Sequence, residues 1–213
     1  NLSNFIKGVG NTTQTGTNNT FVMGESNVVA GLSRNNLIIG SNNEISNGVN
    51  NATVVGNYGL AERDGEFVVG GGGFSGAGKG YAQHSTITLT GTTTDATPTN
   101  LFVNGNSSIT TIARDANTIL TSFTGFEANV MGVRTGGTAA GAVDDSIFLR
   151  ATGIIHVKAY SQSVSTLGSF GTVTGWTAAV NDSGAFNLHF EVTGAANMDI
   201  SWSATLNIYE IKV

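Results

Sequence analysis

Phe21-Val22-Met23-Gly24 is the stretch that decides the fold, because its pattern recurs along the first third of this 213-residue chain. Three mostly apolar residues followed by a glycine return at Leu37-Ile38-Ile39-Gly40, Thr53-Val54-Val55-Gly56 and Phe67-Val68-Val69-Gly70, with a weaker first copy at Phe5-Ile6-Lys7-Gly8. The glycines stand at positions 8, 24, 40, 56 and 70, so the steps are 16, 16, 16 and 14 residues. A recurring unit of this kind indicates stacked structural repeats.

Two of the repeats also carry a second short strand-like piece, and the repeats have their own turn residues. Val28-Val29-Ala30 and Glu44-Ile45-Ser46 lie between the tetrapeptides, and pairs such as Asn35-Asn36 mark the corners. Glycine and asparagine tolerate the left-handed backbone conformations that tight corners need. We therefore predict a parallel β-roll over residues 1–70, with two short strands in each rung of about 16 residues. Rungs stacked about 4.8 Å apart would share one core.

Both faces of the repeated strand are apolar. Side chains alternate along a strand, so the middle residue of each tetrapeptide points away from its two neighbours. A narrow coil standing alone should have one apolar face and one wet face. We therefore expect one face to fill the coil and the other to pack against further chains. The residues that we assign to packing between chains are the middle ones: Val22, Ile38, Val54 and Val68.

Glycine-ended apolar triplets with Asn and Gly corners, over residues 1–70, resemble the head domain of trimeric autotransporter adhesins. Similar rolls occur in the shafts of bacteriophage tail fibres. The resemblance implies a left-handed parallel β-roll in which three chains pack side by side, and hence a homotrimer.

Residues 71–83 are glycine-rich and are predicted to form a neck between two domains. Gly73, Gly78 and Lys79 have the spacing of a phosphate-binding loop, but Gly80 stands where that loop needs Ser or Thr. The residues that follow alternate like a strand instead of forming the helix that such a loop precedes. A linker is the better interpretation.

The remaining residues, 84–213, are predicted to form a second all-β domain. Longer alternating segments, separated by Gly, Asn and Asp, indicate strands with no helical stretch between them. The candidate strands are His84–Thr90, Leu101–Val103, Ser108–Ile112, Thr118–Phe126, Ala128–Val133, Ile147–Ala151, Ile154–Tyr160, Thr172–Trp176, Phe186–Val192 and Met198–Val213. This spacing favours a jelly-roll-like β-sandwich head.

The last strand alternates clearly up to Ile208, with Trp202 among its inward residues. The pattern breaks at Ile208-Tyr209, where a β-bulge would keep Tyr209 and Ile211 facing inward. Three segments resemble small C-terminal domains of phage tail-fibre and other virion proteins: Tyr81–Ser85, Thr94–Phe102 and Ile200–Ala204. This resemblance implies a trimeric fibre tip that contacts a host surface, often a glycan.

Composition excludes several classes of function. Nine basic residues and a net charge of −5 argue against nucleic-acid binding, which needs clustered Lys and Arg. The absence of cysteine excludes disulfides, zinc–thiolate sites and cysteine nucleophiles. No run of about 18 apolar residues predicts membrane insertion. The chain begins with Asn1, and we expect it to be a fragment or a processed product.

No catalytic residue, metal site or cofactor is predicted. The three histidines, His84, His156 and His189, lie on the polar faces of predicted strands and lack metal-ligand spacing. The pair Asp144-Asp145 and the residue Asp182 stand where turns require them. The expectation is therefore that the protein is not an enzyme.

Four residues are candidates for receptor binding: Trp176, Tyr160, Asn181 and Asp182. An exposed aromatic ring can stack on a sugar ring, and the amide and carboxylate can bind hydroxyl groups. The alternative for Trp176 is a place in the sandwich core. Trp202 is in phase with apolar neighbours and is expected to be core.

The favoured function is the structural and receptor-binding part of a phage tail fibre or spike. As a homotrimer in the virion tail, it would attach the virion to a host cell-surface glycan or protein. One alternative is a fragment of a bacterial trimeric surface adhesin, located on the cell surface. Others are a polysaccharide-depolymerising spike with carboxylates between subunits and a purely architectural virion protein.

Overall fold

The computed structural model describes residues 3–73, 78–103, 122–156, 159–182 and 188–212. Every regular element within these ranges is a β-strand, which confirms the predicted all-β class. The described residues therefore include no helix able to cross a membrane. The chain divides into two units: residues 1–87, 121–123 and 208–213 form unit 1, and residues 88–120 and 124–207 form unit 2.

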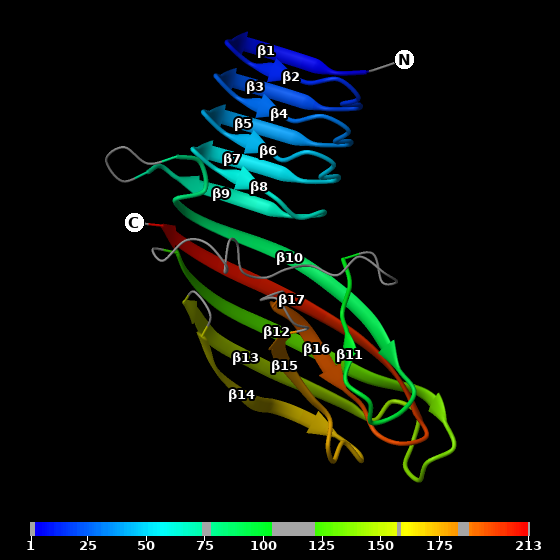
Figure 1. Cartoon of the computed structure of the whole chain (residues 1–213). Coiled ribbons are helices and arrows are strands. Elements are labelled where there is room, and N and C mark those ends of the chain that lie inside the picture. Colours follow the sequence, from blue (N-terminus) through cyan, green and yellow to red (C-terminus); the bar gives the residue numbers. More distant parts are fainter. Residues whose placement is uncertain (1–2, 74–77, 104–121, 157–158, 183–187, 213) are drawn as a thin grey trace. The chain divides into compact units, whose positions relative to one another are not determined.

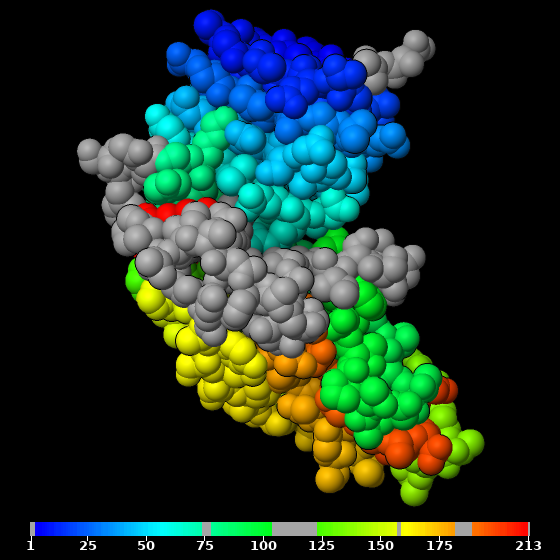
Figure 2. Space-filling model, viewed as in Figure 1, coloured from blue at the N-terminus to red at the C-terminus, as the bar shows by residue number. Residues whose placement is uncertain are grey.

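Unit 1 contains a parallel β-solenoid, which confirms the predicted roll (Figure 1). Five long strands make one ladder: β1 (Phe5–Val9), β3 (Phe21–Glu25), β5 (Leu37–Ser41), β7 (Thr53–Asn57) and β9 (Phe67–Gly71). Four short strands make the other: β2 (Thr12–Thr13), β4 (Val28–Val29), β6 (Glu44–Ile45) and β8 (Leu60–Ala61). The successive rungs are seen as layers from blue to cyan (Figure 2).

The register of the long strands reproduces the sequence repeat. Phe5 pairs with Phe21, Phe21 with Leu37, Leu37 with Thr53, and Thr53 with Phe67. The glycine of each tetrapeptide is required because the rungs approach one another closely there. A Cβ added to Gly40, whose φ is 133°, would collide with the carbonyl oxygen of Gly56 in the next rung.

Asparagine side chains occupy two kinds of position in the rungs. Asn19, Asn35 and Asn51 stand at exposed corners with φ of 51°, 56° and 57°, as the corner interpretation predicts. Asn27 and Asn43 are instead fully buried. Asn43 Nδ2 donates to Gly56 O at 2.8 Å, while its Oδ1 accepts from Gly59 N at 2.8 Å. These buried amides satisfy backbone groups that the turn leaves unpaired.

The core of the solenoid corrects one sequence expectation. The middle residues Val22, Ile38, Val54 and Val68 are fully buried and belong to one cluster with the short-strand residues Val29, Ile45 and Ala61. They cannot pack against another chain, because the long strand turns these side chains toward the short strand of its own rung. The neighbours in each tetrapeptide face outward instead.

The remaining strands form two hydrogen-bonded groups, and β10, β12 and β17 each have residues in both units. One has the order β10-β17-β12-β13-β14 and the other the order β11-β16-β15. The bounds are β10 (Ala82–Thr93), β11 (Thr99–Asn100), β12 (Ser122–Gly137), β13 (Ser146–His156), β14 (Ala159–Phe170), β15 (Thr177–Asp182), β16 (Leu188–Thr193) and β17 (Met198–Lys212). The predicted jelly-roll sandwich is not confirmed by this arrangement.

Several predicted boundaries differ from the observed ones. The segment Thr172–Trp176 is not a strand, whereas the serine-rich β14, which shows no apolar alternation, is one. The predicted strand Ser108–Ile112 lies outside the described residues. The predicted neck, 71–83, overlaps β9 at Gly71 and β10 from Ala82 onward.

Candidate interaction surface

An apolar stripe covers the outward face of the long strands in unit 1. We define the outer stripe as the first and third residues of these strands: Phe5, Lys7, Phe21, Met23, Leu37, Ile39, Thr53, Val55, Phe67 and Val69. All but Lys7 and Thr53 are apolar. Phe21 and Met23 are each 37% exposed, and Phe67 is 45% exposed. Contiguous apolar surface of this kind marks an interaction site in soluble proteins.

The outer stripe is ordered by stacking between rungs. The rings of Phe5 and Phe21 are 4.8 Å apart and nearly parallel, with 13° between their planes. Strand β10 continues the same face, because its His84 pairs with Val69 in the antiparallel register with β9. The His84 ring stacks in turn on Tyr209 at 4.8 Å. The result is an apolar and aromatic surface suited to packing against another protein surface.

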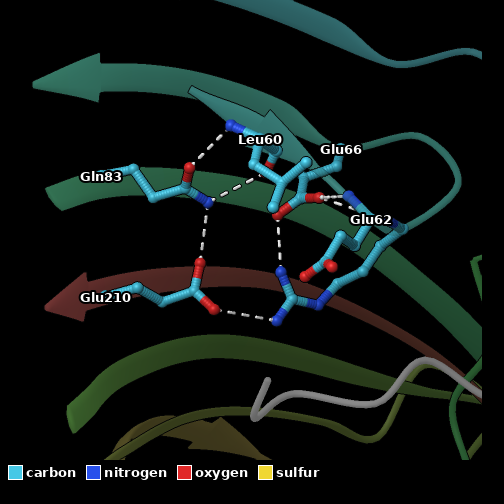
Figure 3. Close-up of polar contacts among 6 residues, drawn as sticks. Leu60, Glu62, Glu66, Gln83 and Glu210 are labelled. Atoms are coloured by element: carbon cyan, nitrogen blue, oxygen red, sulfur yellow. Dashed lines mark hydrogen bonds and ion pairs between the residues drawn. The ribbon is translucent and has the colours of Figure 1, made fainter. Parts of the chain in front are cut away.

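A buried polar network closes the base of the solenoid (Figure 3). Arg63 Nη1 lies 2.7 Å from Glu66 Oε1, and Arg63 Nη2 lies 3.2 Å from Glu210 Oε1. Gln83 Nε2 donates to the other oxygen of Glu210 at 2.8 Å. The Gln83 side chain also binds both the N–H and the carbonyl of Leu60, at 2.9 and 3.1 Å. The network thus links the last rung to strands β10 and β17.

Two carboxylates lie beside a single cation in this network. Burial by itself would lower the pKa of the Arg63 guanidinium, but the carboxylates of Glu66 and Glu210 raise it above its ordinary value. Glu66 Oε2 also accepts from the backbone N–H groups of Glu62 and Arg63, at 2.9 and 3.2 Å. Glu66 and Glu210 are 0% and 2% exposed, so neither faces a substrate, and the network's role is structural.

The base of the solenoid also shows that the predicted bulge in the last strand is wrong. The alternation of β17 continues without a break through its last residues. Glu210 and Lys212 are buried, whereas Tyr209 and Ile211 are 48% and 47% exposed. A strict two-residue period in the sequence would have indicated these buried charges. The apolar character of Tyr209 and Ile211 suggested the opposite orientation.

The four predicted receptor-binding residues do not form one exposed site. Trp176 is only 5% exposed, and its ring meets that of Trp202 at 5.6 Å in an edge-on arrangement. It is therefore a core residue, as the alternative interpretation of Trp176 predicts, and the interpretation as an exposed ring is wrong. Tyr160 is 41% exposed at the start of β14. Asn181 Nδ2 donates to Glu191 Oε2 at 2.7 Å.

Asp182, the fourth predicted residue, ends β15, where its backbone pairs with Leu188. The rest of the predicted turn at 181–184 lies outside the described residues. The sequence predicts His189 on the polar face of its strand, but it is only 1% exposed, with Nε2 2.9 Å from Glu191 Oε1, so that prediction is wrong. Across the described ranges, no three His, Asp or Glu side chains gather as metal ligands would.

No protein-family model and no curated protein matches the chain. Three solved tailspike structures are similar to it. That of Acinetobacter baumannii phage AM24 has 12% identity and a TM-score of 0.31, covering 89% of this chain and 40% of that one. That of Acinetobacter baumannii bacteriophage Fri1 has 9% identity and a TM-score of 0.36, and the match covers 91% of this chain and 38% of that one. That of Acinetobacter phage vB_ApiP_P1 has 13% identity and a TM-score of 0.27, and the match covers 91% of this chain and 47% of that one.

This chain spans less than half the length of each of the three tailspikes. The similar structures correct one expectation. The Fri1 protein is described as a capsular polysaccharide depolymerase, which is an enzyme. The sequence-based exclusion of enzymatic activity is therefore wrong.

Proposed function

We propose that this chain is part of a bacteriophage tail fibre or tailspike that attaches the virion to a host cell-surface glycan or protein. It works as a homotrimer in the virion tail. The observation that carries the proposal is the outer stripe, an apolar face on a coil whose core is already complete. The repeat that builds this coil resembles the heads of trimeric adhesins and the shafts of phage tail fibres.

The outer stripe supports packing of the chain against copies of itself. Val22 and its equivalents already fill the coil, so the outward residues Met23 and Ile39, which are 37% and 38% exposed, are not part of its core. Fully burying an aliphatic or aromatic side chain contributes about 1.5–3 kcal/mol relative to leaving it exposed. A row of such residues is therefore a large driving force for association, and three copies around an axis would cover every stripe.

Assembly of this kind has a direct consequence for attachment. Three identical binding sites on one particle act together, and linked sites bind far more tightly to a repeating surface than one site does. A bacterial surface glycan is such a repeating ligand. A weak contact in each chain is enough when the trimer holds three of them close together.

The proposal is tested on a printed array of purified bacterial capsular polysaccharides and O-antigens, probed with the full chain. We expect retention of the chain by at least one glycan. The variant Met23→Asp/Ile39→Asp should lose at least tenfold in apparent affinity, because the charges separate the copies. Thr12→Asp, which adds charge on an exposed short strand, is the matched control and should bind like the parent chain.

Reducing ends released from the retained glycan are measured in the same samples. This measurement tests whether the chain cleaves the glycan that it binds. Release would favour a depolymerising spike over a purely adhesive one. Absence of binding to every glycan on the array and to intact bacterial cells would overturn the proposed attachment function.

A further inference from the structure

One corner of the solenoid holds a residue that its backbone conformation disfavours. Rung by rung, the corner after the long strand is occupied by Gly10, Ser26, Asn42 and Tyr58. The same hydrogen bond fixes this corner in successive rungs. Asn42 N donates to Glu25 O at 2.9 Å, and Tyr58 N donates to Ser41 O at 3.1 Å. Tyr58 has a φ of 58°, in the left-handed region.

Tyrosine is conformationally disfavoured at this corner, because the corner requires a left-handed φ. Glycine and asparagine adopt left-handed φ readily, whereas a bulky residue there is an outlier. Such outliers persist where the surrounding structure imposes them, and they cluster at ligand-binding sites. The Tyr58 side chain is 37% exposed, so burial in the core does not offset the strain. The position presents an aromatic ring to solvent at a conformational cost.

Backbone hydrogen bonds bring two charged residues to the same corner. Glu44 N donates to Gly59 O at 2.8 Å, directly after Tyr58, and Gly80 N donates to Tyr58 O at 2.7 Å. Lys79 directly precedes Gly80, and its side chain forms an ion pair with Glu44, with Lys79 Nζ 2.8 Å from Glu44 Oε2. The Lys79 and Glu44 side chains are 26% and 33% exposed. A residue with an exposed aromatic side chain and a partly exposed ion pair are thus held at the same corner by backbone hydrogen bonds.

We propose that Tyr58, Glu44 and Lys79 form a saccharide-binding site on the solenoid. The inference rests on the proposed attachment to a glycan and adds the place where one sugar unit binds. A sugar ring has an apolar face of C–H groups, which packs on an aromatic ring, and hydroxyls at its rim. The Glu44 carboxylate accepts hydrogen bonds from hydroxyls, and the Lys79 ammonium donates to sugar oxygens or pairs with an anionic substituent.

The ion pair is suited to this role. An ion pair that is partly open to solvent contributes only modestly to stability, so the fold does not require the full bonding capacity of its atoms. Charge-assisted hydrogen bonds to a ligand are stronger than neutral ones. Asn42, in the same corner one rung earlier, offers a further amide along the solenoid axis. The site therefore combines an apolar platform with several polar groups, as ligand sites commonly do.

The test uses Tyr58→Asn in the full chain, which reproduces the residue found at the equivalent corner, Asn42. Its expected signature is a gain in stability with a loss of binding. Relief of the left-handed strain should raise the melting temperature by about 2–4 °C for a chain of this size. Affinity for the polysaccharide retained on the array, measured by calorimetric titration, should fall at least tenfold.

Leu32→Asn is the matched control. Leu32 also has a left-handed φ, 62°, and is 63% exposed, but it stands at a different corner of the rung. Its replacement should raise the melting temperature similarly and leave the affinity unchanged. The variant Glu44→Gln/Lys79→Met should lower the affinity at least tenfold with a melting-temperature change below about 2 °C, because a partly exposed ion pair stabilises the fold only modestly.

The outcomes separate this inference from the function on which it rests. If the parent chain binds a polysaccharide and Tyr58→Asn binds it equally well, the corner site is overturned and the attachment function stands. If Tyr58→Asn loses both stability and binding, Tyr58 is structural and the site is likewise overturned. If the parent chain binds no polysaccharide on the array, the corner site fails together with the proposed attachment to a glycan.

Discussion

The core of the solenoid and its base are built from opposite kinds of side chain. Along the core, one inward position carries Ile38, Val54 and Val68 in successive rungs, and all are fully buried. At the base the same position is Ser85, which pairs with Val68 in register. Beside it, an ion pair joins Arg63 to Glu210, 147 residues further along the chain. Rungs repeat by local pattern, whereas their termination requires residues from a distant strand.

This difference separates two physical roles. A repeated apolar core stabilises any number of rungs, because each rung buries its neighbour's surface. A buried ion pair adds little net stability, since desolvation opposes the attraction, but removal of one partner is strongly destabilising. The base therefore specifies which strands end the solenoid, and the core supplies the stability.

The largest expected effect comes from breaking the base at its centre. Arg63→Met leaves Glu66 and Glu210 buried without their shared cation, which should lower the free energy of unfolding by about 3–5 kcal/mol. Urea denaturation measures the change. Arg34→Met is the matched control, because Arg34 is exposed, and it should alter stability by less than about 0.5 kcal/mol. Equal effects of the two substitutions would contradict the assigned role of the base.

Removal of all three charges together should destabilise the chain less than removal of the cation alone. Arg63→Met/Glu66→Gln/Glu210→Gln leaves no unpaired charge in the buried site, so it should recover part of the loss caused by Arg63→Met. The same urea experiment measures this recovery. A further loss would mean that the carboxylates stabilise the base independently of Arg63.

The core is tested by two adjacent residues that face opposite ways. Ile38→Ala creates a cavity in the fully buried column and should destabilise the chain by about 2–5 kcal/mol. Ile39→Ala, at a position 38% exposed, should cost the fold of a single chain less than about 1 kcal/mol. Urea denaturation at a protein concentration where the chains are dissociated makes the comparison. A larger effect at Ile39 would reverse the assignment of the two faces.

The smallest of these effects distinguishes buried from exposed asparagines. Asn43→Ala leaves Gly59 N and Gly56 O without their side-chain partner, at an expected cost of about 1–3 kcal/mol. Asn35→Gly keeps the left-handed corner and removes only an exposed amide, so the change should stay within about 0.5 kcal/mol. Thermal unfolding of both variants measures the difference, and equal melting temperatures would show that the buried ladder has no special role.

The sequence predicts most of the solenoid for a physical reason. Its contacts join residues about 16 positions apart, and the same residue types recur at each step, so the repeat records the register directly. The sequence also shows that both strand faces are apolar, but not which one is inside. That choice depends on where the short strand lies, and the middle residues Ile38 and Val54 proved to be core.

The sequence does not predict the base of the solenoid or the tyrosine corner. The base joins Arg63 and Gln83 to Glu210, and no local pattern records a contact over such a separation. Tyr58 breaks the turn chemistry of its corner, and only comparison with Asn42 one rung earlier shows the anomaly. Strand β14 in unit 2 is likewise not predicted, because its polar sequence has no apolar alternation that would indicate a strand.

The mass in solution tests the central claim, that a solenoid with a complete core assembles through its outer stripe. Light scattering coupled to size exclusion, at several concentrations, should give three times the 21.8 kDa of one chain. Met23→Asp/Ile39→Asp should shift this to one chain without loss of the β-sheet circular dichroism, and Thr12→Asp should leave it unchanged. A mass of 21.8 kDa for the parent chain at every concentration would contradict the claim.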